Sequence, residues 1–189
     1  MAKLIHAPLI PGEVAQLRAG DSVLLSGTIY TGRDAAHKRL CALVAQGEPL
    51  PFNVANQVIY YAGPCPAKLG DAIGSCGPTT SYRMDAYAPT LCGLGLIGMI
   101  GKGQRSEAVV QAIRRCGGVY FAATGGAGAL IATCVRSARV IAFDDLGTEA
   151  IRELQVENLP LIVAIDAHGG NLYEEGPARY RRDTAHERP

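Results

Sequence analysis

Two short segments of this chain each combine a turn with an arginine, a pattern that can bind anions. Residues 26–37 contain Arg33, and residues 77–85 contain Arg83. In both, the residue pattern predicts a strand end, a turn and the start of a helix. Helix N-termini offer unpaired N–H groups and a positive dipole end, and a guanidinium adds a planar fork that fits a carboxylate. Two such segments predict a ligand with two carboxylates.

A third cation, Lys102, stands between Gly101 and Gly103 at the end of an apolar stretch. Glycines on both sides bare the backbone and let a ligand approach closely. The carboxyl end of a strand is also where open α/β sheets place their ligands. An ordinary surface lysine in a turn fits the same pattern, so the sequence leaves both interpretations open.

The neighbours of the two arginines have structural explanations beside functional ones. Asp34 suits the start of a helix, because a carboxylate interacts well with the helix dipole. His37 lies four residues after Arg33 on the same helix face, where it either orients a carboxylate or is simply half-buried. Good N-cap residues, which need no further function, are Thr79, Thr80 and Ser81.

Several common kinds of site are missing from the sequence. Gly101-Lys102 lacks the spacing of a P-loop, and the glycines after residue 124 do not complete a dinucleotide fingerprint. The six cysteines are scattered without a C-x-x-C pair, which favours free thiols over disulfides or a metal site. The four histidines give no spacing for a Ser/His/Asp triad. Cationic clamps without an electrophile therefore predict a site that another chain completes.

The composition excludes other broad classes of protein. The 189 residues carry a formal net charge of +1, with 48% hydrophobic and 19% charged residues. Such a chain can build a packed core, and its balanced charge argues against nucleic-acid or membrane-surface binding. The sequence begins without a signal-like apolar run, and no stretch is long enough to cross a membrane. We therefore expect a soluble, cytoplasmic protein.

Strand and helix patterns alternate, most regularly after residue 96, which predicts an α/β fold with a mixed, partly parallel sheet. Residues 1–175 form the predicted domain and residues 176–189 a polar tail. The expected strands are 22–29, 58–62, 96–100, 119–122, 139–143 and 159–165, with a further candidate at 73–76. The expected helices are 33–44, 79–91 (bent or ended by Pro89), 107–115 and 148–154, with a helix or loop at 125–133.

At these motifs the chain resembles the β subunit of the iron–sulfur-dependent hydro-lyases, the class I fumarase and L(+)-tartrate dehydratase family. In single-chain members the equivalent part is the C-terminal domain. The matching segments are 26–37, 60–64, 77–85, 98–103 and 165–172, and the likeness extends over residues 3–173. The resemblance implies a swivelling β/β/α domain, that is, one layer of helices on two layers of sheet.

The resemblance also implies roles for individual residues. Arg33, Arg83 and Lys102 would hold a dicarboxylate, and Thr80 would add a hydrogen bond to it. Thr79 would face the carbon that gains or loses a proton and is the family's suggested base. A threonine hydroxyl is a weak base, so it needs an activating neighbour, expected from the partner chain. The supporting residues around the two loops would be Asp34, His37 and Ser81.

The implied cofactor is a 4Fe–4S cluster held by three cysteines of a separate α subunit, so this chain itself would bind no metal. The labile iron would act as a Lewis acid on the substrate's hydroxyl and carboxylate groups. The motifs look closer to the fumarase side, which implies reversible hydration of fumarate to L-malate. Dehydration of L(+)-tartrate to oxaloacetate and a non-catalytic dicarboxylate-binding module stay as alternatives. The surface meant for the α subunit also leaves room for the isolated chain to self-associate.

Overall fold

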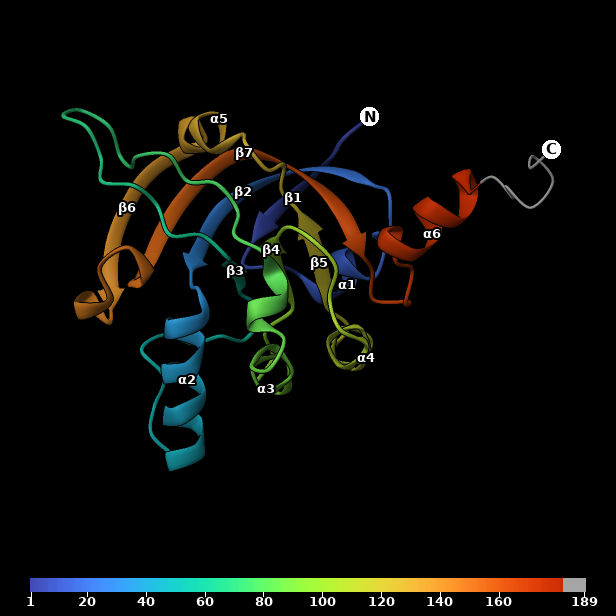
Figure 1. Cartoon of the computed structure of the whole chain (residues 1–189), viewed down its shortest axis with the longest axis horizontal. Coiled ribbons are helices and arrows are strands. Elements are labelled where there is room, and N and C mark those ends of the chain that lie inside the picture. The colour runs from blue at the N-terminus through green and yellow to red at the C-terminus, as the bar shows by residue number, and fades with distance from the viewer. Residues whose placement is uncertain (182–189) are drawn as a thin grey trace, which may run out of the picture.

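Five parallel strands form the centre of the computed structural model, which describes residues 1–181 (Figure 1). In spatial order they are β1 (Lys3–Ala7), β2 (Ser22–Thr31), β3 (Val58–Tyr60), β4 (Gly98–Gly101) and β5 (Val119–Ala122). This spatial order is also the chain order. Because neighbouring parallel strands point the same way, their carboxyl ends meet at one edge of the sheet.

Two antiparallel strands, β6 (Val135–Ala142) and β7 (Ile151–Ile165), complete the sheet. One edge of β7 pairs with β2 over most of its length. The other edge pairs first with β6 and then with β5. The pairing of β7 with both β2 and β5 closes the sheet on itself, and in Figure 1 β6 and β7 arch over the parallel strands.

Helices cover the face of the parallel strands that lies away from β6 and β7. Figure 1 shows three of them on this side: α2 (Asp34–Gln46), α3 (Ala88–Gly93) and α4 (Glu107–Cys116). The remaining helices are α1 (Pro11–Val14), α5 (Gly128–Thr133) and α6 (Leu172–Tyr180), with two 3-10 turns, η1 (Ser81–Met84) and η2 (Asp144–Glu149). No helix within residues 1–181 is long and apolar enough to span a membrane.

Alternation along the strands produces two separate cores. In β5, Val119 and Phe121 face the core between the two layers of strands, whereas Tyr120 faces the core beneath the helices. Successive strand side chains point to opposite faces, so β2 to β5 contribute to both cores, whereas β1 contributes only to the core between the strand layers. This arrangement confirms the predicted α/β fold with a mixed, partly parallel sheet, and its layers follow the β/β/α order that the resemblance implies.

The predicted helix over residues 79–91 is wrong. Thr79 donates its N–H to the Tyr61 carbonyl, and Ser81 donates its N–H to the Lys102 carbonyl. These bonds to neighbouring strand ends keep residues 79–80 extended, and only the short turn η1 and then α3 follow. Pro89 stands in the first turn of α3, where its missing N–H costs nothing.

The predicted helix over residues 148–154 is also wrong, because most of it belongs to β7. Leu154 and Val156 are buried on either side of the exposed Gln155, which is the two-residue period of a strand. The segment is paired with β2 on one edge and β6 on the other. This double ladder outweighs the helical propensity of a short polar stretch.

Two smaller differences remain. The candidate strand at residues 73–76 is irregular chain. The segment 125–133, expected as a helix or loop, is a turn followed by α5 and so agrees with the expectation. The predicted polar tail, residues 176–189, begins inside α6, which continues to Tyr180. Residues 182–189 of that tail lie outside the described part of the chain.

Candidate active site

The predicted site residues lie near the ends of β2, β3 and β4. Backbone bonds continue the parallel ladder past these ends: Gly32 donates to Tyr60, Tyr61 donates to Ile100, and Ala123 donates to Gly101. The turns that follow the strands are therefore fixed relative to one another. Ligands of α/β sheets bind at this edge, and the turns after β2 and β4 carry Arg33 and Lys102.

Lys102 and the threonine segment are directly joined. Thr80 forms a parallel bridge with Lys102, and the Ser81 N–H donates to the Lys102 carbonyl over 2.9 Å. On the other side, the Thr79 N–H donates to the Tyr61 carbonyl over 2.7 Å. The segment 79–81 thus lies between the ends of β3 and β4, as a short extra strand would.

Gly101 makes this close approach possible. A Cβ atom at Gly101 would lie 2.0 Å from Ser81 Oγ and 2.9 Å from Tyr61 Cδ2, so no larger residue fits between them. The flanking glycine Gly103 has φ +87°, a backbone conformation that side chains other than glycine rarely adopt. The two glycines around Lys102 are therefore explained by packing and backbone geometry, and they need no bound ligand.

Arg33 stands at the N-cap position of α2, and Glu149 holds it. Its Nη2 atom lies 3.1 Å from Glu149 Oε1 and 3.8 Å from Asp34 Oδ1. Glu149 Oε2 also accepts the Ala35 N–H, at 3.3 Å. Gly63 leaves the space for the side chain, since a Cβ atom there would lie 3.1 Å from Arg33 Cδ. One side of the guanidinium is thus neutralised, and its buried Nε has no partner within residues 1–181.

His37 is fully buried. Its Nδ1 lies 2.9 Å from the Arg33 carbonyl, so the neutral ring donates there and Nε2 is left without a partner among the described residues. Burial, helped by the charge of Arg105, lowers the pKa of His37 to about 4. His37 is therefore fully buried and not half-buried, and it contacts the backbone of the Arg33 turn. Its role in supporting that turn stays a prediction.

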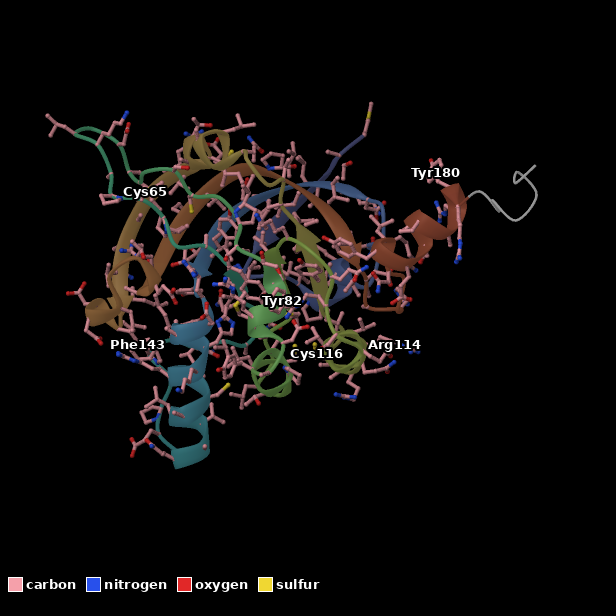
Figure 2. The ribbon with its side chains drawn as sticks, in the orientation of Figure 1. Cys65, Tyr82, Arg114, Cys116, Phe143 and Tyr180 are labelled. Atoms are coloured by element: carbon pink, nitrogen blue, oxygen red, sulfur yellow. The ribbon has the colours of Figure 1, made fainter. Side chains whose placement is uncertain are left out.

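Arg83 and Lys102 are two cations near this edge that no acidic side chain of residues 1–181 neutralises. Both side chains are exposed, and neither forms an ion pair within the described residues. Arg83 belongs to η1, whose exposed neighbour Tyr82 is labelled near the centre of Figure 2. Thr79 is half-buried, and its hydroxyl has no hydrogen-bond partner within residues 1–181. The two cations can bind an anion, and the Thr79 hydroxyl can accept or donate a proton.

A buried ion pair supports this edge from the helix side. Arg105 Nε lies 2.7 Å from Asp85 Oδ1, and the arginine side chain is 0% exposed. The second Asp85 oxygen accepts the Ser106 N–H at 2.6 Å, which satisfies one of the free N–H groups at the start of α4. The Arg105 guanidinium lies 5.2 Å from the Tyr61 ring and 5.0 Å from the Tyr120 ring. It therefore packs behind the site and does not line it.

Among the described residues the cysteines form neither a disulfide nor a group that could hold a metal, although the thiols of Cys92 and Cys116 lie within hydrogen-bonding reach of each other. All six are free, and no three His, Cys, Asp or Glu side chains within residues 1–181 are grouped so that they could hold a metal ion. Cys65 is exposed on the loop after β3, toward the upper left of Figure 2, and Cys116 ends α4. Burial raises the pKa of Cys76, the cysteine nearest to Thr79 in the sequence, to about 12, so it is an unreactive thiol.

The sequence profile of the family described as Fumarase C-terminus matches residues 3–176. The chain belongs to this family. It is 41% identical, over 86% of its own length and 87% of the other's, to the "Putative L(+)-tartrate dehydratase subunit beta" of Methanocaldococcus jannaschii. It is 36% identical to the aerobic class I fumarate hydratase of Escherichia coli K12 and to fumarate hydratase 2 of Leishmania major. The chain spans 31% and 29% of those two proteins, so it matches one part of a longer enzyme.

Membership of the Fumarase C-terminus family fits a hydro-lyase β subunit, as the motifs predicted. The motifs did not reveal several residues that position the site. Glu149 holds Arg33 from a distant turn, and the hydroxyls of Tyr120 and Tyr173 both bond to the backbone of Gly103. No local pattern marks these residues, because each meets its partner only after the sheet has formed. Asp85 belongs to the segment 77–85 that the sequence analysis singled out, but the spacing of residues along the chain does not predict its ion pair with Arg105.

Proposed function

We propose that this chain is the β subunit of an iron–sulfur-dependent hydro-lyase that hydrates fumarate reversibly to L-malate. The observation that carries the proposal is the joining of two segments at this edge: Thr80 forms a bridge with Lys102, and the Ser81 N–H donates to the Lys102 carbonyl. Thr79 and Arg83 each lie within two residues of Ser81 in the chain, and neither Arg83 nor Lys102 forms an ion pair within the described residues. A small dicarboxylate needs two cationic groups at a short separation. Family membership supports the reaction class.

In this proposal Lys102 and Arg83 bind the carboxylates, Thr80 adds a hydrogen bond, and Arg33 contributes the part of its guanidinium that Glu149 leaves free. Thr79 holds or moves the proton at its Oγ1 atom. The backbone bond from Thr79 to Tyr61 fixes where that atom lies. Because no side chain within residues 1–181 bonds to this hydroxyl, its activating group comes from the partner. Asp34, His37 and Ser81 support the loops.

The cluster belongs to the partner α subunit. The residues of this chain do not fit it, since no group of three potential ligands exists among the described residues. When bound, the cluster supplies the Lewis acid for the substrate's hydroxyl group. Free thiols are typical of a reducing compartment, which supports a cytoplasmic location for the pair.

The deciding experiment is co-expression with an iron–sulfur α chain, anaerobic purification and an assay of fumarate absorbance. We expect turnover by the pair and none by either chain alone. A pair that carries Lys102→Met is the matched control, because this exposed side chain makes no ion pair in the described structure. Equal activity without the α chain, or full activity of the control pair, would contradict the proposal.

A second candidate reaction is the dehydration of L(+)-tartrate to oxaloacetate. It is favoured by the Methanocaldococcus jannaschii relative, which is matched along 87% of its length. The same preparation should be assayed with both substrates, and the ratio of the two kcat/KM values assigns the reaction. Binding of fumarate and tartrate without turnover of either by the assembled pair would instead indicate a dicarboxylate-binding module.

A further inference from the structure

The hydroxyl of Tyr120 lies where the two substrate loops of the proposed site meet. Tyr120 is in the middle of β5, and its side chain is fully buried beneath the helices. Its hydroxyl oxygen lies 2.9 Å from the Gly103 carbonyl and 2.9 Å from Ser81 Oγ. Ser81 belongs to the threonine loop, and Gly103 follows Lys102. One oxygen atom therefore joins the two loops that carry Thr79 and Lys102.

The direction of these two hydrogen bonds follows from which of the three groups carries a proton to donate. A tyrosine hydroxyl has one proton, and a carbonyl can only accept. Tyr120 therefore donates to Gly103, and the Ser81 hydroxyl must donate to Tyr120. In this series of hydrogen bonds, Ser81 donates to Tyr120 and Tyr120 donates to Gly103, so the Tyr120 hydroxyl both accepts and donates a bond. Such connected chains of hydrogen bonds strengthen one another in a low-dielectric interior.

Gly103 is held from its other side as well. Its N–H donates to the hydroxyl of Tyr173, in the first turn of α6, over 3.0 Å. Both backbone groups of Gly103 thus bond to tyrosine hydroxyls, while the Lys102 carbonyl accepts the Ser81 N–H. The backbone on either side of the Lys102 side chain is fixed, although the side chain itself is exposed.

A phenylalanine would fill the same core position without a polar atom. A buried hydroxyl costs free energy unless it finds partners, and here both partners are in substrate loops. We infer that Tyr120 is a positioning residue of the hydro-lyase site, which sets the distance between Thr79 and the Lys102 ammonium group through Ser81 and Gly103. This inference rests on the proposed function.

The first test is Tyr120→Phe in the reconstituted α–β pair. We expect KM for fumarate and L-malate to rise about 10- to 100-fold, with a smaller fall in kcat, since a small displacement of a positioned group has effects of this size. Tyr60→Phe is the matched control. It removes an equally buried hydroxyl that donates to the Cys76 carbonyl on the opposite face of the sheet. It should lower the melting temperature to a similar extent and leave KM within about twofold.

Equal changes of KM in the two variants would overturn the inference and leave a purely structural role. The variant Ser81→Ala extends the test, because it breaks the same chain of bonds at its other end. If Tyr120 acts through Ser81, the effects of the two substitutions on KM are not additive in the double variant. Additive effects would contradict the inference.

A second measurement does not depend on turnover. In the full β chain, Tyr120→Phe should speed hydrogen exchange of the Ser81 and Gly103 amides about tenfold or more, whereas Tyr60→Phe should not. Unchanged exchange at both amides would overturn the inference even in an active enzyme. Failure of the wild-type pair to act on either substrate would refute the proposed function, while the exchange result would still decide whether Tyr120 fixes the two loops.

Discussion

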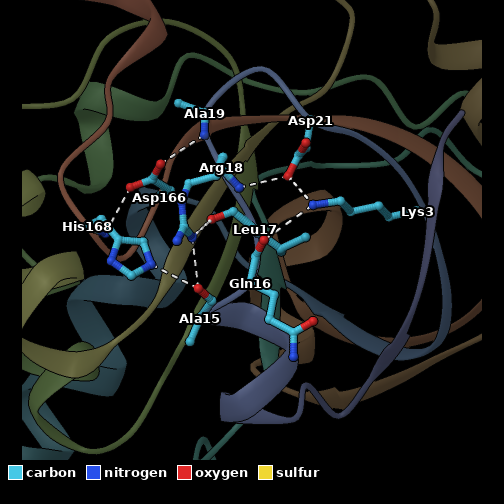
Figure 3. A network of polar contacts seen from close by, with 9 residues as sticks. All are labelled: Lys3, Ala15, Gln16, Leu17, Arg18, Ala19, Asp21, Asp166 and His168. Atoms are coloured by element: carbon cyan, nitrogen blue, oxygen red, sulfur yellow. Dashed lines mark hydrogen bonds and ion pairs between the residues drawn. The ribbon is translucent and has the colours of Figure 1, made fainter.

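Two polar clusters lie at opposite ends of the parallel strands. In only one of them do the charged groups find their partners within the chain, and we call that cluster closed. The Asp166 cluster, drawn in Figure 3, contains Lys3, Asp21, Asp166 and His168 with the backbone of residues 15–19. It lies at the amino ends of β1 and β2, where β7 ends. The candidate site lies near the carboxyl ends of β2, β3 and β4. The two regions differ in how far their polar groups are satisfied within the chain.

In the Asp166 cluster, the charged groups are paired or hydrogen-bonded inside the chain. Asp166 accepts N–H bonds from Ala19, His168 and Gly170 at 2.8–3.0 Å. Burial alone raises the pKa of Asp166, but these three donors together hold it below its usual value. Asp21 accepts from the Lys3 ammonium group at 2.6 Å. A closed cluster of this kind stabilises the turn before β2.

In the candidate site, by contrast, neither Arg83 nor Lys102 forms an ion pair with an acidic side chain within residues 1–181. The cost of leaving these cations free is small while water reaches them, and they stay available to a ligand or a partner chain. Cluster composition alone therefore does not distinguish a structural site from a functional one. The two clusters differ in how many of their charges are paired within the described residues, and four predictions test what this difference means for stability and activity.

Arg83→Ala should have the largest effect. Removal of a cation that binds a carboxylate in a covered site costs on the order of 2–5 kcal/mol, or about 30- to 5,000-fold in kcat/KM. The melting temperature should not change, because Arg83 is exposed and has no ion pair in the described structure. Steady-state kinetics of the α–β pair and thermal unfolding measure the two quantities. The control is Arg136→Ala, which removes an exposed arginine paired with Glu157; a comparable loss of kcat/KM there would contradict the assignment.

Asp166→Ala should lower stability and leave activity nearly unchanged, which is the reverse of the result expected for Arg83→Ala. Loss of three N–H bonds to one buried carboxylate should lower the free energy of unfolding by about 3 kcal/mol. Activity of the α–β pair at low temperature should stay near wild type, since the cluster lies at the far end of the strands. Urea unfolding of the β chain and assay of the pair measure these effects. A stable variant with reduced kcat/KM would show that the two ends are coupled.

His37 makes stability depend on pH. Its pKa in the folded chain, about 4, lies below the ordinary value of 6.5, so the unfolded chain binds the proton more readily. The contribution of His37 to stability is therefore complete above pH 6.5. It is lost as the pH falls from 6.5 toward 4, by about 1.4 kcal/mol per pH unit.

Unfolding in urea at pH 7, 6 and 5 measures this slope. His37→Asn keeps a donor near the Arg33 carbonyl but removes the titrating ring, so the variant should lose most of the slope. An unchanged slope in the variant would assign the acid sensitivity to other groups.

Glu149→Gln should have the smallest effect. The amide keeps the shape of the side chain but loses the charge that holds Arg33 Nη2 at 3.1 Å. We expect a rise in KM worth about 1 kcal/mol, or roughly fivefold, because the partly exposed pair is screened by water. The control is Glu157→Gln, which weakens a surface pair on β7. A fall in KM with Glu149→Gln would mean that the acid repels the substrate more than it orders Arg33.

The local pattern predicted much of the fold. The apolar runs at residues 22–29 and 119–122 became β2 and β5, and the helix ends at Gly47 and Gly117 carry the left-handed conformation of a glycine cap. The predictions failed where bonds from distant strands decide the backbone. Residues 79–81 are extended because they bond to the ends of β3 and β4, and residues 151–156 form a strand because two neighbours pair with them.

The sequence by itself determined the family, the alternation of strands and helices, and which short segments carry cations and hydroxyls. These are properties of neighbouring residues, and they survive in any arrangement of the elements. Only the tertiary structure decided which cations are neutralised. Glu149 reaches Arg33 across more than a hundred residues of chain, while nothing in the described structure reaches Arg83 or Lys102. Charge pairing depends on distances of a few ångströms, and those distances exist only once the sheet has closed.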